Sequence, residues 1–128
     1  MHTLKARSSE REQLVDITAQ VSAHLQESGA REGVLTLFSQ HTTAGLTINE
    51  NSDPDVPRDI LHALRTLIPQ FGMDFKHYEH NSDAHLKTTL VGPSVSVPFC
   101  DGKLLLGHWQ GIFLCEFDGP RWAIETLS

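Results

Sequence analysis

The segment 77–85 reads HYEHNSDAH and concentrates groups that could bind a metal. It carries the three histidines His77, His80 and His85 and the two carboxylates Glu79 and Asp83. Neutral imidazole is a common ligand of Zn, Fe, Ni and Co, and several such groups on one loop can converge on one ion. The spacing matches neither an HExxH helix nor a zinc finger, so composition rather than a motif predicts a metal site. The alternative is a solvated loop whose histidines have no ligand.

Two other histidines end or join segments that are typical of strands. His41 closes the alternating segment 34–41, where a side chain could point past the sheet edge into a cleft. The alternative for His41 is simple packing at the end of a strand. His108, Trp109 and Gln110 stand together in GHWQG, and they offer the aromatic face and hydrogen-bonding groups that a planar heterocycle needs. The alternative for Trp109 is that it fills the core.

Carboxylates gather again at 50–55, which reads ENSDPD. They could serve only to cap a helix. Glu50 or Asp55 could instead act as an acid or base, or orient a ligand histidine. A phosphate site has less support, because the chain has neither a Walker loop nor a GxGxxG motif. The cations near the candidate loops are Arg58, Lys87, Lys103 and Arg121.

The periodicity of hydrophobic residues predicts the elements that hold these groups. Ile17, Val21 and Leu25 recur every four residues, and the pattern runs to Gly29, which predicts a helix with a glycine stop. An Asp-Pro pair at 53–54 starts a second helix that ends near Pro69. Extended or alternating patterns predict strands at 2–8, 12–16, 34–41, 46–50, 94–99, 103–107, 111–117 and 121–126, with Gly45 as a break.

Between these elements, the segment 71–84 is polar and has little periodicity, which predicts a long functional loop. The last third of the chain has the pattern of an antiparallel meander. Strands outnumber helices, so the predicted fold class is α+β and β-rich. We expect an antiparallel two-layer β-sandwich-like sheet with two to three helices, in a single domain over 1–128.

Composition limits the function further. The chain has 128 residues, of which 39% are hydrophobic, and a formal net charge of −6. This charge has the wrong sign for general attraction to nucleic acid or anionic lipid. Cys100 and Cys115 form neither a CxxC pair nor a disulfide framework, and both are poor nucleophile candidates. We therefore expect a cytoplasmic protein with a small-molecule substrate and with no nucleic-acid or membrane partner.

Four stretches together carry a family resemblance: QHTTAGLTINENSDPDV at 40–56, HYEHNSDAHLKTTLVGPS at 77–94, GKLLLGHWQGIFLCEFDGPR at 102–121, and the predicted helix between the first two. The chain resembles the YjbQ family, whose members are often described as secondary thiamine-phosphate synthases. The resemblance implies a β-rich α+β subunit that forms a homotrimer. It also implies a divalent metal near the subunit boundaries, zinc as the first choice and magnesium if the substrate is a diphosphate. The implied activity is weak joining of hydroxymethylpyrimidine diphosphate to thiazole phosphate.

The resemblance and the groups above together define the predicted site. Two residues depart from the family pattern, because His80 replaces a usual glycine and His108 a usual threonine; each could add a ligand or change the pocket. The predicted metal ligands are His41, His77 and His85; the predicted catalytic residues are Glu50, Glu79 and Asp83; the predicted substrate-binding residues are Thr42, Asn51, Asn81, His108, Trp109 and Gln110.

Three functions fit this site. In a transferase, the metal neutralises a leaving diphosphate while Trp109 lines a heterocycle pocket. In a metal-dependent hydrolase of a small phosphorylated or heterocyclic compound, the same ion activates water. In a metal-binding or ligand-binding trimer without catalysis, the site binds but does not turn over.

Overall fold

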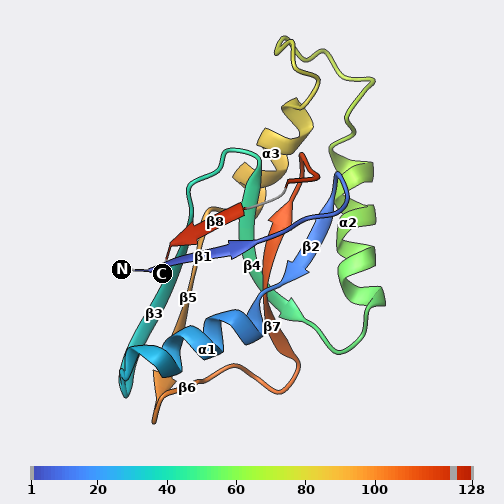
Figure 1. Cartoon of the computed structure of the whole chain (residues 1–128). Coiled ribbons are helices and arrows are strands. Elements are labelled where there is room, and N and C mark those ends of the chain that lie inside the picture. Colours follow the sequence, from blue (N-terminus) through green and yellow to red (C-terminus); the bar gives the residue numbers. More distant parts are fainter. Residues whose placement is uncertain (1, 122–123, 128) are drawn as a thin grey trace.

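A computed structural model describes residues 2–121 and 124–127 (Figure 1). The chain alternates short strands with three helices. In order, the elements are β1 (Thr3–Ala6), β2 (Gln13–Asp16), α1 (Thr18–Ser28), β3 (Glu32–Ser39), β4 (Ala44–Glu50), α2 (Asp55–Leu67), α3 (Ser82–Val91), β5 (Ser94–Cys100), β6 (Lys103–Leu104), β7 (Gln110–Glu116) and β8 (Ile124–Leu127).

The strands form two antiparallel sheets. The larger sheet has five strands in the order β1-β8-β3-β5-β6, and the smaller one has three in the order β2-β7-β4. In the larger sheet, β3 and β5 pair from Glu32↔Cys100 to Phe38↔Ser94. In the smaller sheet, β4 and β7 pair from Ala44↔Glu116 to Glu50↔Gln110. The predicted α+β fold with a two-layer antiparallel sandwich is confirmed.

The predicted meander in the last third of the chain is wrong. β5 and β6 form a hairpin, but β7 lies in the other sheet and β8 pairs with β1 and β3. The reason is the burial of β7, whose residues from Gly111 to Glu116 are all buried. A strand that is apolar on both faces needs cover on both sides. It therefore occupies the centre of the smaller sheet.

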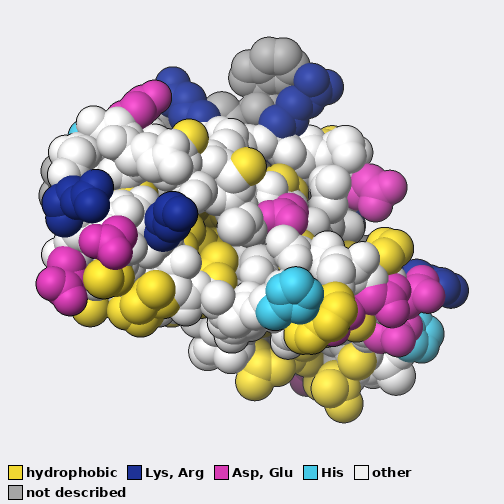
Figure 2. Space-filling model, turned by 90° about the horizontal axis from the view of Figure 1, so that it is seen from below, with side chains coloured by type: hydrophobic (Ala, Val, Ile, Leu, Met, Phe, Trp, Pro, Cys, Tyr) yellow, Lys and Arg dark blue, Asp and Glu magenta, His cyan; other side chains and the backbone are white. Residues whose placement is uncertain are grey.

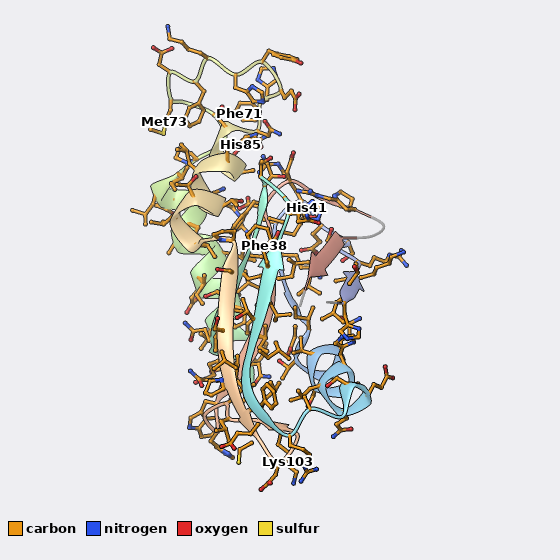
Figure 3. All side chains as sticks on the ribbon, turned by 90° about the vertical axis from the view of Figure 1, so that its left-hand side faces the viewer. Phe38, His41, Phe71, Met73, His85 and Lys103 are labelled. Carbon is orange, nitrogen blue, oxygen red and sulfur yellow. The ribbon has the colours of Figure 1, made fainter. Side chains whose placement is uncertain are left out.

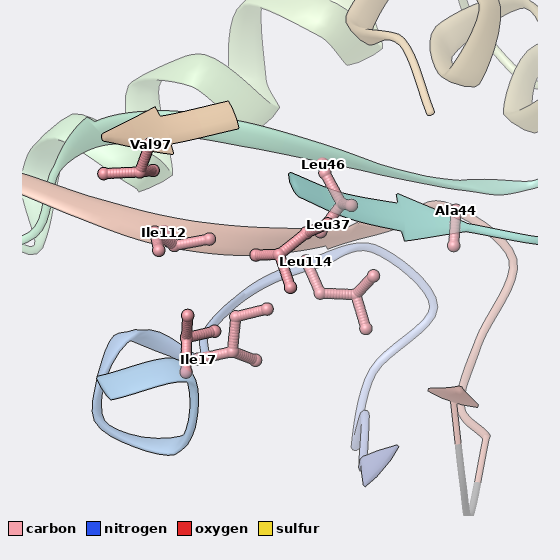
Figure 4. Close-up of a cluster of buried hydrophobic side chains, with 8 residues drawn as sticks. Ile17, Leu37, Ala44, Leu46, Val97, Ile112 and Leu114 are labelled. Atoms are coloured by element: carbon pink, nitrogen blue, oxygen red, sulfur yellow. The ribbon is translucent and has the colours of Figure 1, made fainter. Parts of the chain in front are cut away.

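One hydrophobic core lies between the two sheets and α1 (Figure 4). Alternate residues of β7 point into it, and α1 closes one end. Its fully or almost fully buried members are Ile17, Val21, Leu37, Ala44, Leu46, Val97, Ile112 and Leu114. Because side chains alternate along a strand, the neighbouring residues of β7 point to the opposite face.

That opposite face of β7 packs against α2 and α3. The second core consists of Leu64 from α2, Ala84 from α3, and Phe113, Cys115 and Phe117 from β7 and the residue after it. The helices therefore cover the outer side of the smaller sheet. No helix in the described part of the chain is long and apolar enough to cross a membrane.

The ends of the first two helices follow the predicted signals. Gly29 adopts a left-handed conformation with φ of 72° after α1, as the predicted glycine stop requires. Before α2, the Asp53 carboxylate accepts a hydrogen bond of 2.9 Å from the N–H of Asp55. This bond satisfies one of the free donors at the start of the helix.

The third helix corrects the predicted loop over 71–84. The loop ends at Asn81, and α3 begins at Ser82. The face of α3 that is buried carries Asp83, Ala84, Lys87 and Thr88. A buried helix face made largely of polar residues has no hydrophobic periodicity, so the pattern did not indicate a helix.

Gly45 does not break a strand as predicted, because it lies within β4. A Cβ atom at this position would come within 2.6 Å of the Gly92 carbonyl oxygen. That carbonyl accepts a hydrogen bond of 3.1 Å from the N–H of Leu46. The glycine therefore allows the end of α3 to approach the strand closely.

Candidate functional site

The predicted site residues lie at the two opposite ends of β4. At one end Ala44 pairs with Glu116, and at the other Glu50 pairs with Gln110. Six residue steps along a strand cover about 20 Å. One chain therefore holds two separate groups, which we call the histidine end (His41, His77 and His85) and the tryptophan end (Glu50, Asn51, His108, Trp109 and Gln110).

The histidine end is built from three segments distant in sequence. His41 lies in the connection between β3 and β4, His77 in the loop before α3, and His85 in the first turns of α3. Figure 3 shows His41 and His85 at the same end of the sheets, below the long loop that carries Phe71 and Met73. Thr42 is exposed beside His41.

His77 and His85 form a pair. Their ring centroids lie 5.4 Å apart, and the rings are almost perpendicular at 87°. Both line a pocket of about 420 Å³ together with Phe75, Ser82 and Leu86. The carboxylate of Glu79 lies 3.8 Å from Nε2 of His77. The pair thus brings two imidazoles into the lining of a largely apolar pocket, with a carboxylate beside His77.

His41 does not join this pair within the chain. Its Nδ1 atom lies 3.4 Å from Nη1 of Arg121. Its Nε2 atom is buried and has no hydrogen-bond partner among the described residues. Among residues 2–121 and 124–127, no three His, Cys, Asp or Glu side chains are grouped so that they could hold a metal ion.

A buried carboxylate orients Arg121. Glu116 is fully buried, and its Oε1 atom accepts a hydrogen bond of 2.9 Å from Nη2 of Arg121. The hydroxyl of Thr43 accepts a second, short bond from the same nitrogen. Ser8 donates to the other Glu116 oxygen at 2.9 Å. These contacts place an ionic network at the histidine end of the sandwich core.

Asp83 is the centre of a second ionic network, beneath α3. The carboxylate is fully buried and accepts bonds from both Arg11 nitrogens, at 3.0 and 3.1 Å, and from Lys87 at 2.8 Å. Lys87 also donates to Glu12 at 3.0 Å. Burial alone raises the pKa of Asp83, but the bonds from Arg11 and Lys87 outweigh it and lower the pKa. The position of Asp83 supports a role in fixing α3 rather than in proton transfer.

Asn81 and His80 of the long loop lie outside both ionic networks and the histidine pair. Asn81 is buried and donates a hydrogen bond of 2.8 Å to Asp118. His80 has a φ of 59°, a left-handed conformation, and its ring lies 6.1 Å from that of Phe71. The replacement of the usual glycine by His80 therefore retains a backbone conformation that glycine adopts more readily.

At the tryptophan end, backbone and side-chain bonds shape one turn. The N–H of Asn51 donates to the Trp109 carbonyl at 3.1 Å, and the Gln110 side chain accepts from the N–H of Gly107 at 2.8 Å. His108 and Trp109 stack edge to face, with centroids 4.6 Å apart. Trp109 is 58% exposed, so the alternative that it fills the core is wrong.

The two cysteines are placed as their sequence context predicts. Cys115 is buried in the second core, and burial raises the pKa of its thiol to about 12. Cys100 is half-buried at the end of β5 and is a free thiol. A thiol that is not ionised at neutral pH is a poor nucleophile.

Sequence reasoning missed the residues that hold the histidine end together. They are Ser8, Arg11, Glu12, Arg65 and Glu116, and Arg65 and Lys87 both contact Glu12. One signal was available, since Glu116 interrupts the apolar run from Ile112 to Phe117. A carboxylate in a buried strand indicates a buried cation partner.

Comparisons with known proteins agree with this architecture. A crystal structure of a YjbQ/UPF0047 protein from Clostridium acetobutylicum superposes with a TM-score of 0.95 at 46% identity, covering 99% of this chain and 97% of that one. A conserved hypothetical protein from Thermus thermophilus, TT1486, gives 0.91 at 42% identity, with coverages of 99% and 97%. The fold thus places the chain in a class of small α+β sandwich proteins.

Sequence relatives identify the family within that class. YugU from Bacillus subtilis is 46% identical over 121 residues, which cover 94% of this chain and 92% of that protein. MJ1081 from Methanocaldococcus jannaschii is 51% identical over 115 residues, with coverages of 90% and 83%. The family model described as "UPF0047 protein YjbQ-like" matches residues 2–126. The chain belongs to the YjbQ (UPF0047) family.

Proposed function

We propose that the histidine end is a metal-assisted site for a small phosphorylated heterocyclic substrate, and that the reaction is a thiamine-phosphate-synthase-like transfer. The observation that carries the proposal is the His77–His85 pair in the lining of the pocket of about 420 Å³. Phe75 and Leu86 give this pocket an apolar lining. A pocket with apolar walls and a few polar groups is typical of small-molecule sites.

The two histidines of the pair supply part of the ligand set that a divalent ion requires. Two neutral imidazoles are suitable ligands for zinc, but a zinc site in a protein normally has at least three protein ligands. His41 offers an unpartnered buried Nε2 atom, which is the donor that such a site lacks. Because His41 is not grouped with His77 and His85 in the described part of one chain, we place the third ligand on a second copy.

The exposed surface of the chain supports an assembly, which we propose is a homotrimer. Figure 2 shows hydrophobic side chains gathered at the lower right of the face in view, beside histidine and acidic side chains. Several large apolar residues around the long loop are more than half exposed: Leu67, Phe71, Met73, Tyr78 and Leu90. Exposed apolar groups of this kind mark protein interfaces. A second copy could cover them and supply the missing imidazole.

The same assembly gives the tryptophan end a role. In one chain Trp109 and His108 lie about 20 Å from the histidine end. A copy that supplies His41 to a site keeps its own Trp109 about 20 Å from that site, so in the proposed trimer the third copy brings its exposed indole to stack on the heterocycle. Thr42, Asn51 and Gln110 then provide hydrogen bonds, and Glu50 or Glu79 provides a base.

The proposed chemistry requires charge neutralisation and positioning. When bound, a divalent ion stabilises the negative charge that develops on a leaving diphosphate. The chain's own residues orient the two reactants: Trp109 holds the heterocycle, and Asp83 fixes α3 and with it His85. The reaction needs no protein nucleophile, which agrees with the buried thiol of Cys115.

An activity assay with matched variants tests this proposal. Purified protein is supplied with hydroxymethylpyrimidine diphosphate, thiazole phosphate and Zn²⁺ or Mg²⁺. The expected result is thiamine phosphate formation that falls at least about a hundredfold in His85→Ala, as is typical when a metal site loses a ligand or its support. His62→Ala, on the exposed side of α2, is the matched control and should retain activity.

Two results contradict parts of the proposal. If diphosphate is released at the same rate without thiazole phosphate, the protein is a metal-dependent hydrolase. If metal binds but neither product forms, the site binds without catalysis. Either result rules out the transferase. The metal content of the same samples shows separately whether the protein binds a metal.

A further inference from the structure

Asn81 occupies the N-cap position of α3, but its side chain does not cap the helix. Asparagine is among the best capping residues, because its side-chain oxygen accepts from the free N–H groups of the first turn. Here only the backbone carbonyl of Asn81 serves the helix, accepting from the N–H of Ala84 at 3.0 Å and from that of His85 at 3.3 Å. The side chain of Asn81 is therefore used for something else.

Asp118 holds the Asn81 side chain and fixes which way its amide faces. Nδ2 of Asn81 donates to Oδ2 of Asp118 at 2.8 Å. An ionised carboxylate only accepts hydrogen bonds, so the amide presents its NH₂ group to Asp118 and its Oδ1 atom faces elsewhere. The backbone N–H of Asp118 donates at 3.1 Å to the fully buried Glu116, which anchors this contact.

The Oδ1 atom of Asn81 is an acceptor without a donor. Asn81 is only 6% exposed, and its Oδ1 atom is buried with no hydrogen-bond partner among residues 2–121 and 124–127. A buried polar atom without a partner destabilises a fold, so one that persists calls for an explanation. Rotation of the side chain to cap α3 would give this atom a donor, but it would break the bond to Asp118. The arrangement keeps one acceptor ready for a donor from outside the chain.

Asn81 lies between the two halves of the histidine end. On one side, its backbone carbonyl binds the N–H of His85. On the other side, its amide binds Asp118, in the segment whose arginine contacts His41. Residues 76–80, which precede Asn81, are all exposed, so a ligand can reach the amide by displacing the loop rather than the core.

We propose that Asp118 is a positioning residue, which holds the amide of Asn81 so that its carbonyl oxygen accepts a hydrogen bond from an amino group on the heterocycle of the substrate. The proposal deepens the proposed function and rests on it for the substrate class. An ionised phosphate carries only acceptors and cannot bind an amide oxygen, whereas an exocyclic amino group can. Asn81 thus recognises the ring of the substrate and not its phosphates.

Calorimetric titration with two ligands tests the proposal. One is hydroxymethylpyrimidine diphosphate, whose ring carries an amino group, and the other is its analogue with hydrogen in place of that group. Wild type, with Mg²⁺ present, should bind the amino compound at least about tenfold more tightly, because the analogue leaves Oδ1 unpaired. In Asp118→Asn, residue 118 can also donate and no longer fixes the Asn81 amide, so the two Kd values should agree within about twofold. Asp59→Asn, the same change on the exposed side of α2, should keep the wild-type ratio.

A swap of the two residues separates positioning from a purely structural role. In the double variant Asn81→Asp with Asp118→Asn, the amide at 118 donates to the carboxylate at 81, whose other oxygen still accepts from the ligand. The ratio of the two Kd values should therefore recover. A structural role would weaken the binding of both compounds equally and leave the ratio unchanged. If Asp118→Asn does not fold, Asn81→Ser decides, because serine can cap α3 but lacks the amide oxygen.

The remaining outcomes distinguish the two proposals. Equal affinity of the wild type for both compounds, or a wild-type ratio in Asp118→Asn, overturns the role of Asn81 and Asp118. If thiamine phosphate forms although the wild type does not discriminate, only this inference fails. If the wild type discriminates but forms no thiamine phosphate, only the proposed transfer fails. If neither compound binds, both proposals are wrong.

Discussion

The Nη1 atom of Arg121 lies 3.4 Å from the Nδ1 atom of His41. A guanidinium can only donate hydrogen bonds, so Nδ1 of His41 accepts, and the neutral ring carries its proton on Nε2. That Nε2 atom is buried and lacks a hydrogen-bond partner among the described residues. The contact therefore makes Nε2 the atom with which His41 meets a ligand.

The first prediction concerns the tautomer of His41. In the metal-free protein, long-range ¹H–¹⁵N spectra should show the proton on Nε2. Addition of Zn²⁺ should move it to Nδ1 and break the contact with Arg121, because coordination takes the lone pair of Nε2 and a protonated Nδ1 cannot accept from a guanidinium. His41→Ala assigns the signal. A proton on Nδ1 before metal is added would contradict the contact with Arg121.

The second prediction concerns the buried charges beneath α3. Asp83→Asn takes from the fully buried Lys87 one of its two carboxylate partners and leaves it Glu12, while Arg11 loses both of its bonds to the carboxylate of residue 83. The free energy of unfolding should fall by about 3 to 5 kcal/mol, as is typical when one member of a buried ion pair is removed. Urea denaturation measures it. Asp74→Asn, which replaces an exposed residue of the loop, should change the free energy of unfolding by no more than about 0.5 kcal/mol. A loss of stability as large as that of Asp83→Asn would contradict this account.

The third prediction is a loss of stability in acid. Hydrogen bonds from Arg11 and Lys87 outweigh burial and lower the pKa of Asp83 in the folded chain. The ionised carboxylate therefore stabilises the fold fully above its unfolded pKa of about 3.9, and this contribution disappears as the pH falls through the lower folded pKa. Urea denaturation of wild type and Asp83→Asn from pH 7 to pH 2 should show the difference between them shrinking below about pH 4. A constant difference over that range would rule the mechanism out.

The fourth prediction concerns the approach of α3 to β4. In Gly45→Ala, the new methyl group meets the Gly92 carbonyl oxygen at 2.6 Å, and backbone cannot move aside as a flexible side chain can. We expect a loss of about 1 to 3 kcal/mol, typical of overpacking. Gly107→Ala is the control, because its nearest neighbour at 3.3 Å is the flexible Gln110 side chain. The explanation fails if both variants unfold at the same urea concentration.

Elements with a regular apolar pattern could be predicted from the sequence. Ile17, Val21 and Leu25 fixed one face of α1, and Gly29 marked its end, as observed. The helix α3 could not be predicted in this way, because Asp83 and Lys87 are buried on the face where apolar residues are expected. Their burial depends on Arg11 and Glu12, which lie more than 70 positions away.

The candidate site, like α3, could be predicted from the sequence only in part. The sequence places His77 and His85 in one histidine-rich segment, and the structure pairs them. The sequence does not reveal that His41 and Trp109 lie at opposite ends of the smaller sheet, because this arrangement depends on the pairing of β4 with β7.

A metal site shared between His41 of one copy and the His77–His85 pair of another is tested most directly by the metal content of mixed oligomers. His41→Ala and His85→Ala chains carrying different tags are co-expressed, and hetero-oligomers are isolated by both tags without chelators. Each variant alone should lose the metal that the wild type holds. The mixed oligomers should regain part of it, because some boundaries combine an intact His41 with an intact His77–His85 pair. Mixed oligomers as metal-free as either variant alone would contradict the claim.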